Sequence, residues 1–216
     1  MCCNIGKSGI GKSVLLKHII GLMKPDAGKI LIDDLDINLI PFKDLQKIRS
    51  SIGMVFQFGA LFDSMTVGEN ISLALQKLTK LSGDEIKERV FNSLEEVDMV
   101  NTEDLMPSEL SGGMKKRVGI ARAIAIKPAY LFYDEPTTGL DPVMTDSIHR
   151  LILKFQNTGE VTSVIITHEM RTVYDVADRV LLLHEGKIWF DGSPEEIKNV
   201  DDLVVQQFIT GNSTLV

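Results

Sequence analysis

The chain has 216 residues, of which 44% are hydrophobic and 25% charged. This ordinary globular composition excludes a disordered or collagen-like protein. Its net charge of −7 disfavours non-specific nucleic-acid binding, which needs a basic surface. The longest stretch without Asp, Glu, Lys or Arg is 203–216, and it contains polar residues, whereas a membrane-spanning helix needs about 18 apolar ones. With two adjacent cysteines and no signal-peptide pattern, we expect a cytosolic protein that does not cross a bilayer by itself.

The first quarter of the chain predicts a strand, a loop, a helix and two further strands. Residues 2–5 form a short apolar run, and residues 11–23 place apolar side chains at the spacing of one helix face. Pro25 cannot continue that helix, so residues 24–28 are predicted to form a turn. The apolar segments 29–32 and 51–56 are predicted to be strands.

The middle of the chain is predicted to be helical. Residues 66–107 are rich in charge and have a helical pattern, with breaks at Ser82-Gly83 and at Pro107. We interpret them as an inserted helical lobe. Residues 113–126 predict one more helix.

Buried strands and a hairpin are predicted in the second half. The near-continuous apolar runs 129–133 and 163–166 are typical of strands that are covered on both faces. Segments 180–183 and 187–190, joined by Glu185-Gly186, predict an antiparallel hairpin. Ser193-Pro194 followed by Glu196 predicts a capping box at the start of a short helix. Strands that alternate with helices indicate an α/β fold with a mostly parallel sheet.

A glycine-rich loop lies between the first predicted strand and the first predicted helix. It fits the pattern G-x-x-x-x-G-K-S/T and reads Gly6-Lys7-Ser8-Gly9-Ile10-Gly11-Lys12-Ser13. Glycines let backbone N–H groups converge on phosphate oxygens, and the positive end of the next helix points at the same anion. Lys12 would reach the β- and γ-phosphates, and Ser13 would ligate Mg²⁺. The alternative is a purely structural glycine turn.

Two further segments carry polar groups that suit a nucleotide site. The apolar strand 130–133 ends in Asp134-Glu135, which suits the Mg²⁺ side of a phosphate site; the alternative is a strand that simply ends at the surface. Ser111-Gly112-Gly113 precedes a helix and offers a second anion site; the alternative is a plain serine N-cap followed by flexible glycines. The basic side chains that follow are predicted to form a solvated face rather than a nucleic-acid patch: Lys115, Lys116, Arg117 and Arg122.

Together these segments resemble the nucleotide-binding subunit of ABC transporters along essentially the whole chain. Residues 6–13 resemble the Walker A loop, Ser111-Gly112-Gly113 the signature motif, and Asp134 and Glu135 the end of the Walker B strand. Three more motifs are present. Gln57 matches the Q-loop, Gly139-Leu140-Asp141 the D-loop and His168 the switch histidine, and all six motifs occur along the chain in the family's order. The resemblance implies a P-loop NTPase of the ABC type, with a core of residues 1–65 and 108–200, the helical lobe 66–107 and a C-terminal tail 201–216.

The predicted strand ends support this resemblance independently. The glycine-rich loop, Gln57, Asp134 and His168 each follow the carboxyl end of a predicted strand, and open α/β sheets bind ligands at that edge.

The resemblance also implies a mechanism and partners. Two copies would close head to tail on ATP, each ATP lying between residues 6–13 of one subunit and residues 111–113 of the other. Ser13, Gln57 and Asp134 would hold Mg²⁺. Glu135 would polarise the attacking water, His168 would contact the γ-phosphate, and Asp141 would sit at the dimer seam. Such a homodimer would drive an integral membrane permease from the cytoplasmic face of the inner membrane, as a peripheral subunit.

A closer resemblance concerns the transported substrate. The signature reads Leu110-Ser111-Gly112-Gly113-Met114, with Met where most relatives carry Gln, and residues 55–67 and 205–211 point the same way. These resemble the ATPases of Mla/Mce-type transporters, which move phospholipid between membranes, with a small accessory protein as a possible further partner. Relatives carry some dozens of residues before the loop, including early strands and an adenine-stacking aromatic. Because Met1 precedes Gly6 by only five positions, we expect this chain to lack them.

Two other functions remain open at this stage. One is a soluble ABC-type ATPase that acts on ribosomes or DNA, although the chain has no second cassette, heptad insertion or zinc-binding cysteine set. The other is a non-catalytic interaction subunit, against which Lys12, Asp134, Glu135 and His168 argue. The apolar residues Phe58, Leu61 and Phe62 would either dock the membrane partner or form lobe core. The tail 201–216 is expected to pack on a neighbouring subunit or an accessory protein.

Overall fold

The computed structural model describes residues 1–212, and the chain divides into two compact units. Unit 1 is Met1–Arg49 together with the residues from Val164 onward, and unit 2 is Ser50–Ser163. Residues 213–216, at the end of the predicted tail, lie outside the described residues. No helix within residues 1–212 is long and apolar enough to span a membrane.

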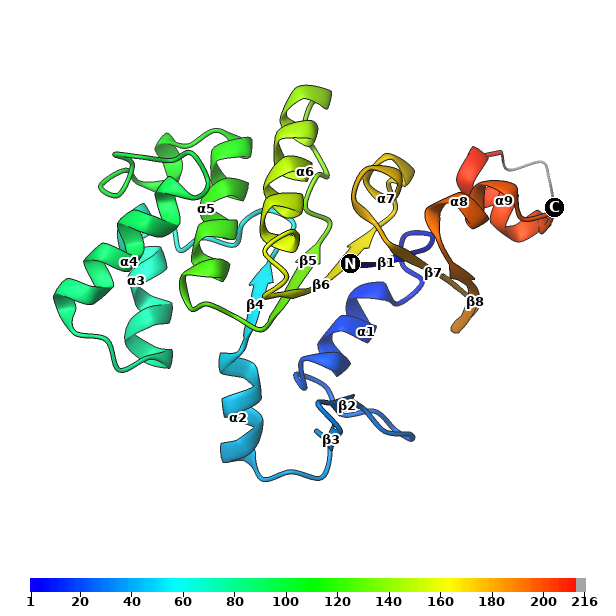
Figure 1. The fold of residues 1–216 in the computed structure, drawn as a ribbon, viewed down its shortest axis with the longest axis horizontal. Helices are drawn as coiled ribbons and strands as arrows, with labels where there is room; N and C mark the ends of the chain where they lie inside the picture. Colours follow the sequence, from blue (N-terminus) through cyan, green and yellow to red (C-terminus); the bar gives the residue numbers. More distant parts are fainter. Residues whose placement is uncertain (213–216) are drawn as a thin grey trace. The chain divides into compact units, whose positions relative to one another are not determined.

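Unit 1 is built around the first strand of the chain. Strand β1 (Cys2–Ile5) is parallel to β6 (Thr162–Thr167) on one side and to β7 (Arg179–His184) on the other (Figure 1). Cys3 and Ile5 have no exposed surface, as expected for a strand with neighbours on both sides. Strand β8 (Lys187–Gly192) pairs antiparallel with β7, which confirms the predicted hairpin.

Helix α1 (Lys12–Ile19) follows the glycine-rich loop and is shorter than the predicted 11–23. It ends because Gly21 adopts a left-handed φ of 70°. The Gly21 N–H then bonds the His18 carbonyl at 3.0 Å, and the Leu22 N–H bonds the Lys17 carbonyl at 2.8 Å. This pair of bonds is the Schellman arrangement that closes a helix.

A small hairpin replaces the single strand predicted at 29–32. It consists of β2 (Leu31–Ile32) and β3 (Leu35–Asp36), paired antiparallel. Asp33 and Asp34 both have positive φ, which is the geometry of a two-residue turn between strands. The next helix, α2 (Phe42–Ser50), was not predicted.

Three short helices complete unit 1: α7 (Met170–Val176), α8 (Pro194–Asn199) and α9 (Leu203–Thr210). The predicted capping box is confirmed, because Ser193 and Glu196 exchange both bonds. Helix α9 lies within the predicted tail and, as described below, contacts its own subunit.

Unit 2 has a short parallel sheet with helices around it. Strand β4 (Ile52–Val55) pairs in parallel with β5 (Tyr130–Asp134). Helix α5 (Gly112–Ala125) packs on β4, and α6 (Pro142–Gln156) follows β5. Together with the parallel strands of unit 1, this confirms the predicted α/β class.

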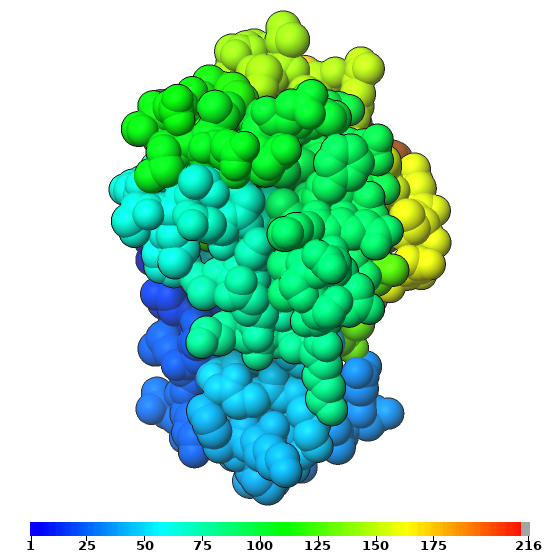
Figure 2. Space-filling view, turned by 90° about the vertical axis from the view of Figure 1, so that its left-hand side faces the viewer, coloured from blue at the N-terminus to red at the C-terminus, as the bar shows by residue number. Residues whose placement is uncertain are grey.

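The helices predicted between residues 66 and 107 are present as α3 (Val67–Leu78) and α4 (Gly83–Glu95), followed by the 3₁₀ turn η1 (Pro107–Glu109). Each helix starts at a capping box, Thr66 with Glu69 and Ser82 with Glu85. The predicted break at Ser82 is therefore an N-cap. Helices α3 and α4 pack on each other, and their cyan to green atoms lie side by side in Figure 2.

Candidate functional site

The glycine-rich loop begins at the carboxyl end of β1. Its backbone has the conformation that phosphate binding requires. Gly6, Gly9 and Gly11 have φ of 155°, 78° and 104°, values that other residues rarely adopt. A Cβ on Gly6 would lie 2.6 Å from the carbonyl oxygen of Leu183, so only glycine fits there. Gly11 is the N-cap of α1 and supplies no side-chain cap, which leaves the positive helix end to an anion.

Lys12 is the buried cation of this loop. Its ammonium donates to the carbonyls of Gly6 at 2.7 Å and Lys7 at 3.1 Å, so it is held over the loop. Lys7, Ser8 and Gly9 are exposed, and Ile10 is half-buried. The loop therefore presents backbone groups and a cation at one surface, which suits a polyphosphate.

His168 lies beside this loop. In the parallel pair of β1 and β6, Ile5 is opposite Thr167. The next residues along these strands are Gly6 and His168, so both emerge at the same sheet edge. His168 is exposed. The predicted neighbourhood of loop and histidine is present within unit 1.

Unit 2 brings together a second group of predicted residues. Val55 of β4 is opposite Tyr133 of β5. Gln57 follows β4 by two positions, and Asp134 is the last residue of β5. These two side chains therefore start from neighbouring strand ends, and Glu135 follows directly.

Glu135 sits in an unusual backbone conformation. Its φ is 51°, a left-handed value that costs energy for a non-glycine residue and is often found at functional sites. Its Oε2 accepts a hydrogen bond from the Thr138 hydroxyl at 3.1 Å. The turn is also held from outside by Lys116, which is only 4% exposed.

Lys116 was predicted to be solvated, and that prediction is wrong. Its ammonium donates to the carbonyls of Pro136 at 2.8 Å, Thr138 at 2.7 Å and Glu135 at 3.4 Å. A buried charge is stable only when its donors are satisfied, and these carbonyls do so. The sequence carried no signal for this role, because lysines in a basic run are normally exposed.

Two arginines of the same run are also structural rather than solvated. Arg117 bonds the Val97 carbonyl, Asp98 and Ser147. Arg122 donates to the carbonyls of Gly59 and Ala60, each at 2.7 Å, and burial lowers the pKa of its guanidinium. Lys116, Arg117 and Arg122 of the predicted basic face therefore all donate to backbone carbonyls.

Ser111 and Asp141 both cap helices. The Ser111 hydroxyl accepts from the Met114 N–H at 3.3 Å, so Ser111 is the N-cap of α5. Asp141 accepts from the N–H groups of Val143 at 2.9 Å and Met144 at 3.0 Å at the start of α6. Both residues are exposed. A Cβ on Gly113 would clash with the Met144 side chain.

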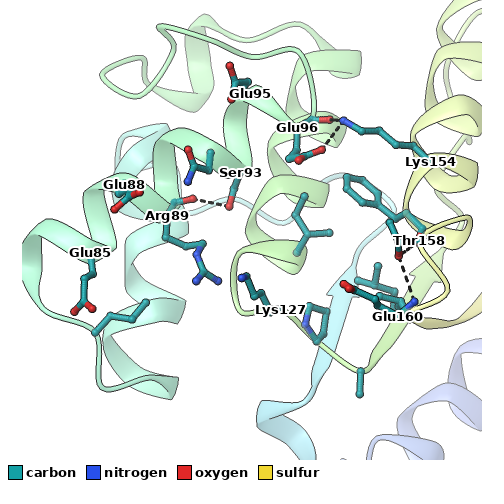
Figure 3. A pocket seen from close by; sticks show the side chains of 18 residues that line it. Glu85, Glu88, Arg89, Ser93, Glu95, Glu96, Lys127, Lys154, Thr158 and Glu160 are labelled. Atoms are coloured by element: carbon teal, nitrogen blue, oxygen red, sulfur yellow. Dashed lines mark hydrogen bonds and ion pairs between the residues drawn. The ribbon is translucent and has the colours of Figure 1, made fainter.

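A large groove exists elsewhere in unit 2. It has a volume of about 970 Å³ and lies among residues of α4, α5 and α6, and Figure 3 shows Arg89 and Lys127 pointing into it. Arg89 bonds the Ala125 carbonyl and Lys154 pairs with Glu96. None of the residues predicted to bind nucleotide line this groove, so it is separate from the candidate site.

The donor set is compatible with Mg²⁺. Within residues 1–212 no group of three or more His, Cys, Asp or Glu side chains is placed to hold a metal by itself. Mg²⁺ usually binds one or two carboxylates together with substrate phosphates. Within unit 2, the amide of Gln57 and the carboxylate of Asp134 start from neighbouring strand ends and are donors of the kind that this mode uses.

Comparison with known proteins agrees with this geometry. The family model described as "ABC transporter" matches residues 3–138. The chain is 38% identical to the intermembrane phospholipid transport system ATP-binding protein MlaF of Haemophilus influenzae, over 97% of this chain and 79% of that protein. It is 40% identical to the protein TRIGALACTOSYLDIACYLGLYCEROL 3 of Arabidopsis thaliana, over 96% of this chain and 65% of that protein. It is 43% identical to the methionine import ATP-binding protein MetN of Carboxydothermus hydrogenoformans, over 87% of this chain and 56% of that protein. The chain thus spans less than two thirds of the last two.

A solved structure shares the fold. It is the dimeric post-hydrolysis state of the ATP-binding cassette MJ0796 bound to ADP and Pi, with a TM-score of 0.82 and 32% identity over 90% of this chain and 85% of that one. The glycine-rich loop with its buried lysine, the strand-end carboxylates and these matches give one result. The chain belongs to the ABC transporter family, as one of its ATP-binding and ATP-hydrolysing domains.

Proposed function

We propose that this ATPase drives phospholipid transport between membranes. The observation that carries the proposal is the 38% identity to MlaF over 97% of the chain. The likeness to the Arabidopsis protein and the Met114 variant of the signature motif support it. We further propose that the chain works as a peripheral subunit on the cytoplasmic face of the inner membrane, together with an integral membrane permease and, as a further partner, a small accessory protein.

In the proposed mechanism, the residues of unit 1 bind the nucleotide phosphates. The N–H groups of residues 6–11 and of the first turn of α1 donate hydrogen bonds to the phosphate oxygens. The Lys12 ammonium exchanges its bonds to the Gly6 and Lys7 carbonyls for phosphate oxygens and so offsets their charge. His168, which emerges beside Gly6, contacts the γ-phosphate.

The residues of unit 2 act on the attacking water. The Glu135 carboxylate accepts a proton from the water and orients it, while Thr138 and Lys116 hold the turn on which Glu135 sits. Gln57, Asp134 and Ser13 would hold Mg²⁺, which would neutralise negative charge on the phosphates. A positioned general base contributes roughly 10²–10⁴ in rate.

Dimerisation is the step that would convert hydrolysis into motion. The related cassette MJ0796 is dimeric, and we propose that two copies of this chain likewise enclose ATP between residues 6–13 of one subunit and 111–113 of the other. Asp141 would lie at the seam. Loss of the γ-phosphate would remove a contact shared by both subunits and open the pair, and this rigid-body motion would reach the permease.

An apolar surface next to Gln57 suits the permease. Phe58 is 73% exposed and Phe62 is 53% exposed, so the alternative that these two residues form lobe core is wrong. Leu61 is half-buried. Exposed aromatic side chains are common in protein interfaces. Phe58 is the next residue in the sequence after Gln57, which is proposed to bind Mg²⁺.

The catalytic part is tested with Glu135→Gln. We expect this variant to bind ATP normally, to hydrolyse it about 10²- to 10⁴-fold more slowly and to accumulate as a dimer in ATP. Phosphate release and light scattering after size exclusion measure these properties. An unchanged turnover rate would remove Glu135 from its role, and a hydrolysis-blocked chain that stays monomeric in ATP would refute the shared site.

The substrate is tested on the complex purified from the native membrane. Phospholipid that copurifies with the complex and is transported between vesicles supports the proposal. The main competing substrate is an amino acid, because MetN is named for methionine import and is 43% identical. Methionine-stimulated ATPase activity without lipid transport would overturn the lipid assignment and leave the ATPase intact. Copurification with ribosomes or DNA, and with no membrane protein, would favour the soluble alternative.

A further inference from the structure

The C-terminal helix α9 contacts the phosphate loop. Val204 and Phe208 of α9 line a narrow cavity together with Lys7 and Ile10 of the loop. The Lys7 ammonium lies 3.5 Å from Gln207 Oε1, which is long for a hydrogen bond and contributes little by itself. The apolar side chains of Ile10, Val204 and Phe208 line the cavity beside this polar contact.

Ile10 carries the only apolar side chain among the loop residues 6–13. It is half-buried between exposed Gly9 and half-buried Gly11. Its Cγ2 lies 3.1 Å from the position that a Cβ on Gly6 would occupy, close to the Leu183 carbonyl of β7. Ile10 thus packs over the first glycine of the loop, with β7 on one side and α9 near it on another.

Helix α9 is anchored by a hydrogen-bonded tryptophan. Asp202, the N-cap of α9, accepts from the Val205 N–H at 3.0 Å. It also accepts from Trp189 Nε1, at 3.1 and 3.2 Å to its two oxygens. The Trp189 ring meets His184 edge to face at 5.3 Å, and His184 lines the same cavity as Ile10. The anchor and the loop contact therefore belong to one cluster of side chains.

We propose that α9 braces the phosphate loop, with Val204 and Phe208 as positioning residues that hold Ile10 in place. Three glycines with positive φ make the loop intrinsically soft, so its phosphate-binding conformation needs support from neighbours. The brace contacts the loop that is proposed to bind the nucleotide phosphates. It therefore acts on ATP affinity and leaves the hydrolysis step largely unchanged.

The test is a titration of the full chain with Mg²⁺ and a non-hydrolysable ATP analogue. Phe208→Ala should weaken binding by about tenfold, and Phe208→Leu, which keeps most of the apolar volume, should restore it. The matched control is Leu203→Ala on the same helix, because Leu203 is 64% exposed and does not line the cavity. In hydrolysis assays Phe208→Ala should raise KM for ATP and leave kcat at saturating ATP nearly unchanged.

The KM–kcat split separates a brace from a general stabilising contact. A variant that merely loses folded protein would lower kcat at an unchanged KM. That pattern, or wild-type affinity in Phe208→Ala, overturns the proposal. If Phe208→Ala does not melt cooperatively, Val204→Ala removes less volume and decides the question, with the same split expected at about threefold.

The single tryptophan of the chain gives an independent readout. Because Trp189 holds the N-cap of α9, its emission should shift as the analogue fills the loop, with the same midpoint as binding. An emission that stays constant through saturation contradicts coupling between loop and helix. These measurements rest on ATP binding by the proposed site but need neither permease nor lipid, so the brace and the lipid-transport proposal can fail separately.

Discussion

Replacing Lys116 by Met should destabilise the protein and slow hydrolysis, because this buried ammonium holds the turn of Glu135. The substitution removes one donor from three carbonyls, those of Glu135, Pro136 and Thr138. A buried carbonyl without a donor costs about 1–3 kcal/mol. Only the bond to Pro136 is fully buried, and water can reach the other two carbonyls. We therefore expect a total loss of about 2–4 kcal/mol.

For a chain of this length, that loss corresponds to a fall in Tm of about 5–15 °C. Turnover should fall further than the folded fraction explains, because a general base displaced by about 1 Å can lose 10²-fold in rate. Thermal denaturation and steady-state phosphate release, both at saturating ATP, measure the two effects.

The matched control for this prediction is Lys115→Met. Lys115 is the neighbour on the same helix and is only half-buried, and its side chain is not required by the Glu135 turn. Lys116→Arg, which keeps a cation at the site, should recover part of the rate. If Lys116→Met retains wild-type kcat below its melting temperature, the ammonium does not position Glu135 and the reasoning fails.

Two further predictions concern the loop and its brace. Gly6→Ala should abolish detectable ATP binding in a calorimetric titration, because its Cβ would lie 2.6 Å from the Leu183 carbonyl oxygen; micromolar affinity in this variant would contradict the loop geometry. The second concerns Asp202, whose pKa is held below its ordinary value of 3.8 mainly by the bond from the Val205 N–H, with Trp189 contributing. The ionised Asp202 carboxylate stabilises the N-cap of α9 fully above its ordinary pKa of 3.8. This stabilisation is lost as the pH falls through the lowered pKa, so Trp189 emission should change below about pH 4. Asp202→Asn keeps an N-cap oxygen and should remove that transition, and a transition that persists in the variant would assign it to another group.

The local structure was largely predictable, because its causes lie within a few residues. The loop 6–13, the capping box at Ser193 and the hairpin turn at Glu185 each depend on neighbours in the sequence. Helix α1 ends early for an equally local reason, the left-handed Gly21. Helix α6 was not predicted, although its start carries a local signal: Asp141 is its N-cap, and a proline occupies its first position.

The sequence by itself determined the α/β class, the phosphate loop and the order of the motifs, since these depend on periodicity, turn chemistry and short-range spacing. Only the tertiary structure decided that Lys116 is buried and that Phe208 and Ile10 line the same cavity. Both facts depend on carbonyls or side chains that are distant in the chain. A lysine in a basic run and a phenylalanine near the C-terminus look the same in sequence wherever they finally pack, because burial is set by the partners that folding brings to them.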